Sequence, residues 1–397
     1  MIESPIFWCG AVVNYEGLRR YRGESPASSQ WSRGLLQGLI HRGVPVEGFS
    51  PIWDALFPKG RLFPGDKRYL EPDIPQTLIR YLNFPGLRTR SVAYSLEKRI
   101  SARLRTGIKP LAILNYNPFP YYCRALDKIA QQNPEISWVN MVLDLDDPAR
   151  DNWNAFKHAT RRASAAVFLS WWGFCNAPIK QKLHLDCGWE GDFPKVKNSD
   201  NNVFVYCGSM GNFGGIRDIV EAIRIFPHNN VRFDFFGKGF NEELKRLAAT
   251  DRRVRFCGFI PDAELEQECQ KATAFLCPRN LEYQGTKMIF PSKLLFYLKF
   301  QKPVICPHIP GLSPDYYNVL ISPPSNKPED WTATMREVLA LSEEAKNALS
   351  TRIRSFLLTK KWDLQAAKLI AFLKELNELK EHSYTNIKPR NPIICSL

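Results

Sequence analysis

Glycine-containing turns follow three short apolar runs in the second half of the chain, at residues 203–210 (VFVYCGSM), 233–239 (FDFFGKG) and 254–261 (VRFCGFIP). Glycine lets backbone amides approach a ligand closely, and the N-terminus of a helix after such a turn favours an anion. The spacing is not G-x-G-x-x-G, so a dinucleotide fingerprint is not supported. Because glycine turns after strands are common, these turns predict an anion site only together with other residues.

A fourth run, RNLEYQGTKMIFPSKLLFYLKF at residues 279–300, adds charged side chains to these turns. In it Ser292 is placed to cap a helix, so that Lys293 lies in the first helical turn. The helix dipole disfavours a cation there, and an anion bound at the same site would offset that cost. A plain serine cap beside a solvated lysine is the alternative interpretation.

Carboxylates end an apolar strand in the first half of the chain, where residues 138–147 read WVNMVLDLDD. A carboxylate in such a place can take a proton from a hydroxyl group, so Asp144 is a candidate general base, with Asp146 and Asp147 as close competitors. The alternative is that these carboxylates cap the helix expected to follow them.

Residues 20–32 (RYRGESPASSQWS) form a loop that leads into a helix capped around Ser28 or Ser29. Glu24 lies in this loop. A glutamate in such a loop can contact a sugar, but we expect Glu24 to be a solvated loop acid.

The elements that must position these residues alternate between strands and helices. The strand-like runs are residues 6–13, 44–49, 111–116, 138–145, 165–170, 203–206, 231–236, 254–257, 274–277 and 303–306. Helical periodicity occurs at residues 28–40, 121–131, 216–225, 241–248, 262–271 and 292–300. This alternation predicts α/β architecture with parallel sheets covered by helices.

The strand–helix pattern restarts near residue 200, after a segment at 187–202 that has the composition of a linker. We therefore predict two Rossmann-like, doubly wound domains, at residues 1–187 and 200–360, which face each other across a cleft. Residues 361–380 are expected to form an amphipathic helix that crosses back to the N-terminal domain, or one that packs on the C-terminal domain. The tail at 381–397 is expected to be irregular.

The chain of 397 residues has a formal net charge of +14, and part of this charge is concentrated in one segment. Residues 57–109 hold twelve Lys or Arg against four Asp or Glu, interleaved with aromatic residues. Such a segment suits the anionic surface of a membrane or a lipid diphosphate, although an ordinary solvated basic face has the same composition.

Composition excludes several classes of protein. No apolar run approaches the roughly 20 residues of a membrane-spanning helix, and the first residues lack the basic region of a signal peptide. The ten cysteines form no C-x-x-C pair and the six histidines show no metal spacing, so we expect reduced core cysteines and no metal site. No zinc module or RNP motif supports a nucleic-acid partner, and the expected location is cytoplasmic.

The order and spacing of GSM, GKG, FCGFIP and FPSKLLFYLKFQKPVICPHIPG resemble the C-terminal half of GT-B glycosyltransferases. The resemblance covers roughly residues 200–315, while the N-terminal half matches only in general layout. The segment FPSKLLFYL is similar to bacterial surface-polysaccharide transferases of the family-4 type and to xanthan-type glucuronosyltransferases. The resemblance implies a nucleotide-sugar donor, without a cofactor or a metal, in the C-terminal domain.

The resemblance also implies roles for individual residues. The loop at Gly208, Ser209 and Met210, with the turn at Gly237, would contact the donor, and the loop at Phe259 and Ile260 would hold its base. The diphosphate would be bound by Arg279, Ser292 and Lys293, with Glu282 near the sugar. Asp144 falls where the xanthan-type enzymes place their base, and Glu24 and Ser28 fall in the loop that often binds the acceptor.

The sequence departs from the family-4 pattern at two pairs of positions. An Arg and a Lys are replaced by Ser209 and Gly214, and two glutamates eight residues apart are replaced by Met288 and Phe296. The expected function is transfer of a sugar, from a UDP-sugar, to a lipid-linked or growing surface-polysaccharide acceptor at the inner face of the membrane. The alternative is a non-catalytic homologue that acts as a nucleotide-sugar-binding or partner subunit.

Overall fold

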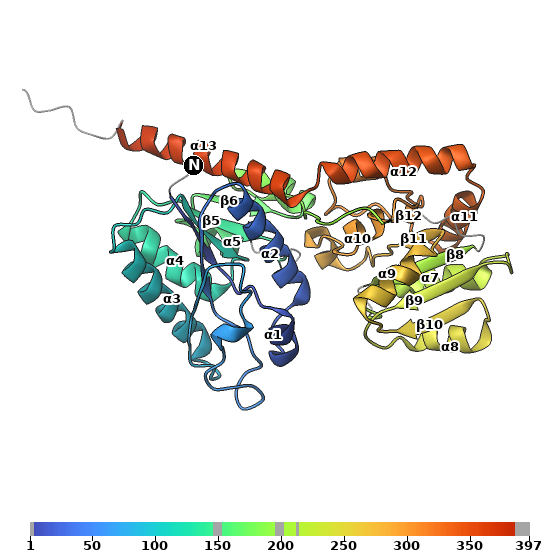
Figure 1. Ribbon diagram of the computed structural model, residues 1–397, viewed down its shortest axis with the longest axis horizontal. Helices are drawn as coiled ribbons and strands as arrows, with labels where there is room; N and C mark the ends of the chain where they lie inside the picture. Colours follow the sequence, from blue (N-terminus) through green and yellow to red (C-terminus); the bar gives the residue numbers. More distant parts are fainter. Residues whose placement is uncertain (1–3, 146–152, 195–201, 212–213, 386–397) are drawn as a thin grey trace, which may run out of the picture.

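The computed structural model describes residues 4–145, 153–194, 202–211 and 214–385. Two parallel β-sheets, each covered by helices, make up the two halves of the chain (Figure 1). The N-terminal sheet has seven strands in the order β3-β2-β1-β4-β5-β6-β7, and the C-terminal sheet has five in the order β10-β9-β8-β11-β12. The α/β prediction with two doubly wound sheets is therefore confirmed.

The N-terminal sheet is built from strands of three to five residues. They are β1 (Ile6–Cys9), β2 (Val46–Ser50), β3 (Gln76–Leu78), β4 (Ala112–Tyr116), β5 (Trp138–Val142), β6 (Ala165–Phe168) and β7 (Lys182–His184). The helices of this half are α1 (Tyr15–Arg20), α2 (Pro26–His41), α3 (Arg88–Leu104), α4 (Pro120–Gln132), α5 (Trp153–Ala159) and α6 (Trp171–Asn176). A 3-10 turn at Lys67–Tyr69 precedes β3.

Strand β1 explains why both faces of this sheet are covered. Ile6 and Trp8 point into a cluster with α2, while Phe7 and Cys9 point into a second cluster with α3 and α4. Successive side chains of a strand point to opposite faces, so a strand that is apolar at every position needs helices on both sides. Such a strand lies in the middle of a parallel sheet, as β1 does.

The C-terminal sheet follows the same rule. Its strands are β8 (Val203–Cys207), β9 (Arg232–Phe236), β10 (Val254–Gly258), β11 (Ala274–Leu276) and β12 (Val304–Ile305). Its helices are α7 (Ile216–Ile225), α8 (Glu242–Thr250), α9 (Asp262–Gln270), α10 (Leu294–Leu298), α11 (Pro328–Leu339) and α12 (Glu343–Leu358), with 3-10 turns at Gln284–Met288 and Pro314–Asn318.

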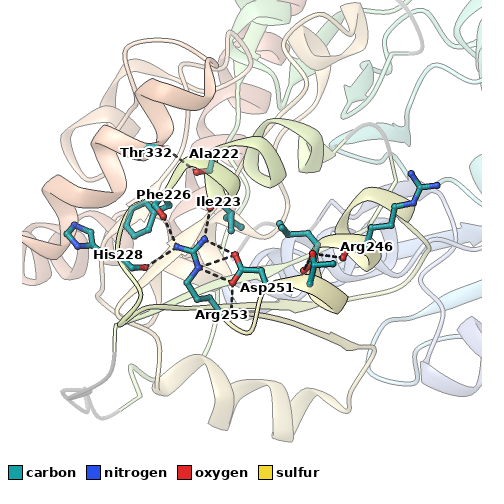
Figure 2. Close-up of polar contacts among 10 residues, drawn as sticks. Ala222, Ile223, Phe226, His228, Arg246, Asp251, Arg253 and Thr332 are labelled. Atoms are coloured by element: carbon teal, nitrogen blue, oxygen red, sulfur yellow. Dashed lines mark hydrogen bonds and ion pairs between the residues drawn. The ribbon is translucent and has the colours of Figure 1, made fainter.

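A single arginine joins several elements of the C-terminal half (Figure 2). The Arg253 guanidinium donates hydrogen bonds to the carbonyl oxygens of Ile223, Phe226 and His228, at 2.6–3.0 Å, and to the carboxylate of Asp251. Ile223 lies in the last turn of α7, while Phe226 and His228 follow the helix, so Arg253 ties the end of α7 to the loop after it. The hydrogen bonds of Arg253 lower the pKa of Asp251.

The last helix, α13 (Trp362–Thr385), lies against α2 of the N-terminal half (Figure 1). A Cβ atom at Gly34 would lie 2.1 Å from the indole ring of Trp362, so this glycine is what lets the two helices approach closely. Further along, the Asn377 amide donates to the carbonyl oxygen of Leu111 at 2.9 Å and accepts from the Ser137 hydroxyl at 2.7 Å.

The two halves also meet at a buried ion pair and at a pair of polar contacts. Lys360, just before α13, donates to the carboxylates of Asp186 and Asp315 at 2.5 and 2.6 Å. At the start of α6 the Ser170 hydroxyl donates to the carbonyl oxygen of Lys287, and the Trp171 amide donates to Gly311 at 2.9 Å. These contacts fix the geometry of the space between the two sheets.

Some elements differ from the sequence-based expectation. Strands β3 and β7 and helix α3 were not expected, and α2 begins at Pro26 with Ser25 as its N-cap rather than around Ser28 or Ser29. Helix α3 is masked in the sequence by its basic residues, although Val92, Leu96 and Ile100 form a buried face at helical spacing. None of the helices described here combines the length and apolar character needed to cross a bilayer.

Candidate functional site

The C-terminal ends of β1, β4 and β5 meet at one edge of the N-terminal sheet, because these strands are neighbours and parallel. The residue after β4, Asn117, adopts φ +55° and is buried. Its side-chain oxygen accepts hydrogen bonds from the amides of Leu143 at 2.7 Å and Asp144 at 3.1 Å. Asn117 therefore fixes the backbone that carries the exposed Asp144 side chain.

A cavity of about 630 Å³ lies beyond this edge. Most of its lining comes from N-terminal loops, while Tyr283, Gly285 and Ile289 reach it from the C-terminal half. The N-terminal lining residues are Gly10, Ala11, Gly23, Glu24, Ser25, Ser28, Trp53, Asp54, Arg88, Tyr116, Asn117, Phe119, Tyr121, Tyr122, Asp144 and Leu145. Glu24 and Ser28, from one segment of the sequence, thus line one cavity with the distant Asp144.

Glu24 differs most from its sequence-based expectation. The carboxyl group is half-buried in the cavity wall rather than solvated, and one oxygen accepts a hydrogen bond from the Trp53 amide at 2.5 Å. Burial raises the pKa of Glu24 to about 8, and the Trp53 amide opposes this shift. At neutral pH the carboxyl group is therefore mostly protonated and can donate a hydrogen bond into the cavity.

Aromatic side chains form much of the remaining wall. The ring centroids of Trp53 and Tyr121 lie 4.6 Å apart, and those of Phe119 and Tyr121 lie 5.5 Å apart. Ser28 forms a side-chain hydrogen bond with Tyr116, whose pKa is raised by burial and by the charge of Asp144. A wall of aromatic faces with a few polar groups is typical of sites that bind small organic molecules.

The C-terminal sheet ends differently, with a glycine after or at the end of three neighbouring strands. The Gly208 amide donates to the carbonyl oxygen of Phe236 at 2.9 Å, and the Gly237 amide donates to that of Gly258 at 2.8 Å. Gly237 has φ +149°, and a Cβ atom there would lie 1.7 Å from the Gly208 carbonyl oxygen. Backbone packs directly on backbone at this edge.

The residues expected to bind a donor differ in accessibility. The side chain of Met210 is fully buried in the core, while Ser209 is exposed, and its hydroxyl accepts from the Gly211 amide at 3.3 Å. Phe259 is 63% exposed, with the Lys238 ammonium 4.4 Å from its ring centroid. Ile260 lines a second hollow beside α9, together with Phe236, Arg255, Phe256, Cys257, Glu264, Gln267 and Glu268.

Arg279 lies at the start of α7. A Cβ atom at Gly215 would lie 2.7 Å from the Arg279 backbone nitrogen, so the helix begins against this residue. The Arg279 Nε atom is buried and has no hydrogen-bond partner among the described residues. Glu282 is exposed. The pKa of Asp218 on α7 is raised, first by the burial of Asp218 and then by the negative charge of Glu282.

The Ser292 cap predicted from the sequence is not formed. Helix α10 begins at Leu294, with Lys293 at the N-cap position and no capping side chain. Ser292 and Lys293 are both exposed, and the Lys293 ammonium lies 5.5 Å from the ring centroid of Phe296. Lys293 is therefore accessible, but the capping argument that singled it out was wrong.

The structure does not bring all the predicted site residues into one cavity. Glu24, Ser28 and Asp144 line the cavity, whereas none of the residues expected to bind the donor does so. Asp146 and Asp147 lie outside the described residues. Across the ranges that are described, no group of three or more His, Cys, Asp or Glu side chains has an arrangement suited to a metal ion.

Trp53 and Arg88 line the cavity but were not singled out in the sequence. Each belongs to a loop or helix start that is distant in the sequence from Asp144. The enrichment of residues 57–109 in basic and aromatic side chains was the only signal available for Arg88.

Residues 201–340 match the protein family described as Glycosyl transferases group 1. Among curated proteins, the chain is 26% identical over 159 residues to the probable glycosyltransferase WbjE of Pseudomonas aeruginosa. This alignment covers 39% of the chain and only 38% of WbjE. The match thus concerns a part of each protein, and the chain spans well under half the length of this curated relative.

Solved structures resemble the chain over nearly its whole length. The lipopolysaccharide outer core galactosyltransferase WaaB, in its apo form, is 13% identical with a TM-score of 0.64, covering 94% of this chain and 99% of WaaB. Anabaena Alr3699/HepE in complex with UDP is 12% identical with a TM-score of 0.61, covering 96% and 100%. The chain has a two-domain GT-B fold, which it shares with these structures.

Proposed function

We propose that this protein is a glycosyltransferase that moves a sugar from a nucleotide-sugar donor, a UDP-sugar, to a lipid-linked or growing surface-polysaccharide acceptor. The observation that carries the proposal is the cavity between the two halves. It joins Asp144 and Glu24 of the N-terminal half to Tyr283 and Gly285 of the segment that matches group 1 glycosyltransferases. The UDP in the complex of the structurally similar HepE supports the choice of donor.

In this proposal the donor lies along the edge of the C-terminal sheet. The backbone at Gly208, with the turn at Gly237, contacts the diphosphate, and Arg279 and Lys293 neutralise its charge. The buried, unpartnered Nε atom of Arg279 supports this role because a phosphate oxygen would supply the missing acceptor. The exposed loop at Phe259 holds the base.

The acceptor lies in the cavity. Its hydroxyl oxygen attacks the anomeric carbon of the donor sugar, the bond from that carbon to the diphosphate oxygen breaks, and the nucleoside diphosphate leaves. Asp144 takes the hydroxyl proton if the transfer inverts the anomeric configuration. Glu24, protonated at neutral pH, donates a hydrogen bond to an acceptor oxygen and is unsuited to act as the base.

We further propose that the protein works at the inner face of the membrane, without a metal or a cofactor. The basic and aromatic segment at residues 57–109 supports contact with an anionic lipid surface. In the fold, this segment contributes Arg88 to the cavity wall. Two of its phenylalanines, Phe63 and Phe84, are exposed. No nucleic-acid partner is part of the proposal.

A second candidate function is a non-catalytic subunit that binds a nucleotide-sugar. Met288 and Phe296 favour it, because they stand where the family-4 resemblance implies two glutamates. Met288 is fully buried against Gly173 of the N-terminal half, so this position has become part of the packing between domains.

A panel of UDP, GDP, ADP, CMP and TDP, followed by thermal unfolding, tests the donor site. A ligand that binds only the folded state at 100 times its Kd adds about 2.7 kcal/mol of stability. We expect UDP to raise the melting temperature of the native protein and to do so much less for Lys293→Ala. Lys374→Ala, which removes an exposed lysine from α13, is the matched control and should respond to UDP as the native protein does.

Turnover then separates the two candidate functions. Release of UDP from a UDP-sugar, dependent on an added acceptor, supports the transferase. Stabilisation by UDP without any release from a panel of UDP-sugars and acceptors supports the non-catalytic subunit. A well-folded protein that no nucleotide stabilises contradicts both.

A further inference from the structure

Two loops that lead to cavity-lining residues, Trp53 and Asp54 on one and Arg88 on the other, are clamped together. The Asn83 side chain, which is fully buried, donates to the carbonyl oxygens of Ala55 at 2.7 Å and Arg61 at 2.9 Å. The Phe57 amide donates to the carbonyl oxygen of Asn83 at 3.1 Å. This clamp holds the loop after β2 against the loop that leads into α3, which fixes the two loops relative to each other.

Arg88 brings a positive charge to the cavity wall. Its guanidinium lies 5.1 Å from the ring centroid of Trp53, and it donates a long hydrogen bond, 3.4 Å, to the carbonyl oxygen of Asp54. The Asp54 carboxylate does not neutralise it, because it accepts from the Ala55 amide and from the amide and guanidinium of Arg61. Within the described ranges, no carboxylate lies at ion-pair distance from Arg88.

Apolar side chains are exposed on the same two loops, a few residues from Asp54 and Arg88. We call Leu56, Phe57, Phe84 and Leu87 the rim patch; they are 38%, 38%, 44% and 45% exposed. The rings of Phe57 and Phe84 stack with centroids 6.2 Å apart, and the Arg88 amide donates to the carbonyl oxygen of Phe84 at 3.0 Å. The patch is therefore part of the same clamped structure as the arginine.

The surroundings of the rim patch are basic. Lys59, Arg80 and Arg90 are exposed on the two loops and at the start of α3. Exposed apolar side chains that cluster next to cations suit an amphiphile whose charged end is an anion. Arg88 differs from the other three because it lines the cavity, where a guanidinium can bind a phosphate through paired donors.

We propose that the part of the cavity lined by Arg88 is a subsite for a phosphate or diphosphate ester with an apolar chain, in which Arg88 binds the anion and the rim patch covers the chain. The inference deepens the proposed function, since the sugar to be extended would occupy the part of the same cavity beside Asp144. It assigns to Arg88 a role in positioning the acceptor and none in the chemical step.

Binding of farnesyl phosphate, measured by calorimetry below its micelle concentration, tests this subsite. Farnesol carries the chain without the anion, and inorganic phosphate carries the anion without the chain. We expect farnesyl phosphate to bind at least about tenfold more tightly than farnesol or inorganic phosphate. Arg88→Gln should lower the affinity for farnesyl phosphate by about tenfold. Arg90→Gln, which removes an exposed arginine two residues away on α3, should change the affinity less than about twofold.

Three outcomes would overturn the proposal. Farnesol could bind as tightly as farnesyl phosphate, the two arginine variants could lose the same affinity, or farnesyl phosphate could fail to bind. In the last case, cosedimentation with phosphatidylglycerol vesicles that both variants weaken equally would assign the rim patch to the membrane surface instead.

Two further variants protect the test against misfolding. Arg88→Lys keeps a charge and should keep part of the affinity for farnesyl phosphate. Phe57→Ser should lower the affinity for farnesyl phosphate and leave the affinity for inorganic phosphate unchanged. Melting curves with UDP are recorded on the same samples. If UDP stabilises the native protein but farnesyl phosphate does not bind, only the subsite is rejected. If UDP does not stabilise the native protein, the donor site is rejected.

Discussion

The two sheets differ at the C-terminal ends of their strands, where we propose that the ligands bind. The strand ends of the N-terminal sheet carry side chains into a cavity: Asp144 after β5, Asn117 after β4 and the loops with Glu24 and Trp53. The strand ends of the C-terminal sheet are closed by backbone contacts, with Gly237 against Gly208. Both halves have the same architecture, so the difference comes from the residues at the strand ends.

This difference suits two kinds of ligand. A diphosphate is recognised well by backbone amides and a few cations, which need little variation in side chains. A glycan presents hydroxyl groups and ring faces, which are recognised by aromatic surfaces and polar groups placed one by one. If this division is right, substitutions at the two edges should fail in different ways.

The largest expected effect is on the chemical step. Asp144→Asn should lower kcat by about 10²- to 10⁴-fold, because it removes the proposed base, and should leave the melting temperature nearly unchanged because the side chain is exposed. Steady-state release of UDP and a melting curve measure the two quantities. Asp73→Asn, at another exposed aspartate of the same half, is the control. If the Asp144→Asn protein transfers sugar at the native rate, Asp144 is not the base and the chemical step does not depend on this edge of the N-terminal sheet.

The next effect is on folding at the other edge. In Gly237→Ala the added Cβ would lie 1.7 Å from the Gly208 carbonyl oxygen, and the φ of +149° is unfavourable for alanine. We expect a loss of roughly 3 kcal/mol in the free energy of unfolding, measured by urea denaturation, and loss of stabilisation by UDP.

Gly191→Ala is the matched control for this variant, since Gly191 also has a positive φ, +100°, but nothing lies within 4 Å of its Cβ position. It should cost about 1 kcal/mol or less. Equal losses in the two variants would mean that backbone strain alone matters, and that the close approach of the two loops does not.

A smaller effect is expected away from the ligand, in the scaffold that holds the C-terminal edge. Arg253→Ala leaves the carbonyl groups of Ile223, Phe226 and His228 without their donor and should cost about 2 kcal/mol in urea denaturation (Figure 2). Arg253→Lys keeps the charge but not the fork of donors, and should recover only part of the loss. Full recovery by lysine would show that charge alone is at work.

The fold could be predicted from the sequence because central strands such as β1, β6, β8 and β11 are apolar or aromatic at every position, and helices such as α4 and α7 are amphipathic. Positions such as Phe7 and Trp8, which point to opposite faces, already imply helices on both sides of a parallel sheet. Strands β3 and β7 escaped notice because they are short and half-buried at the sheet margins.

The candidate site was less accessible to sequence reasoning. Asp144 and Glu24 could be named from their place after a strand and in a loop, and their roles remain predictions. The burial of Glu24 could not be foreseen, because it depends on Trp53, which comes from the loop after another strand. Met210 could not be excluded from the ligand surface for a similar reason, since only packing buries it.

Over a single pH unit, the smallest expected change in the free energy of unfolding concerns Glu24. It tests which carboxyl groups of the N-terminal edge are ionised. Burial raises the pKa of this carboxyl group from 4.5 to about 8 in the folded protein. Between these values the folded state holds a proton that the unfolded state releases, so stability falls as the pH rises from about 4.5 through 8. The slope from one such group reaches about 1.4 kcal/mol per pH unit.

Glu24→Gln should remove this fall, because an amide keeps the shape of the acid and does not ionise. Urea denaturation at pH 5, 6, 7 and 8 measures the slope, and Glu16→Gln, at an exposed glutamate in the same half, should keep the native slope. If the Gln variant is also active, its acceptor KM should stay constant up to pH 8, while the native KM rises as Glu24 loses its proton. A native slope in Glu24→Gln would mean that Glu24 is already ionised in the folded protein at neutral pH. The N-terminal edge would then hold two carboxylates, and the assignment of the base to Asp144 alone would no longer follow.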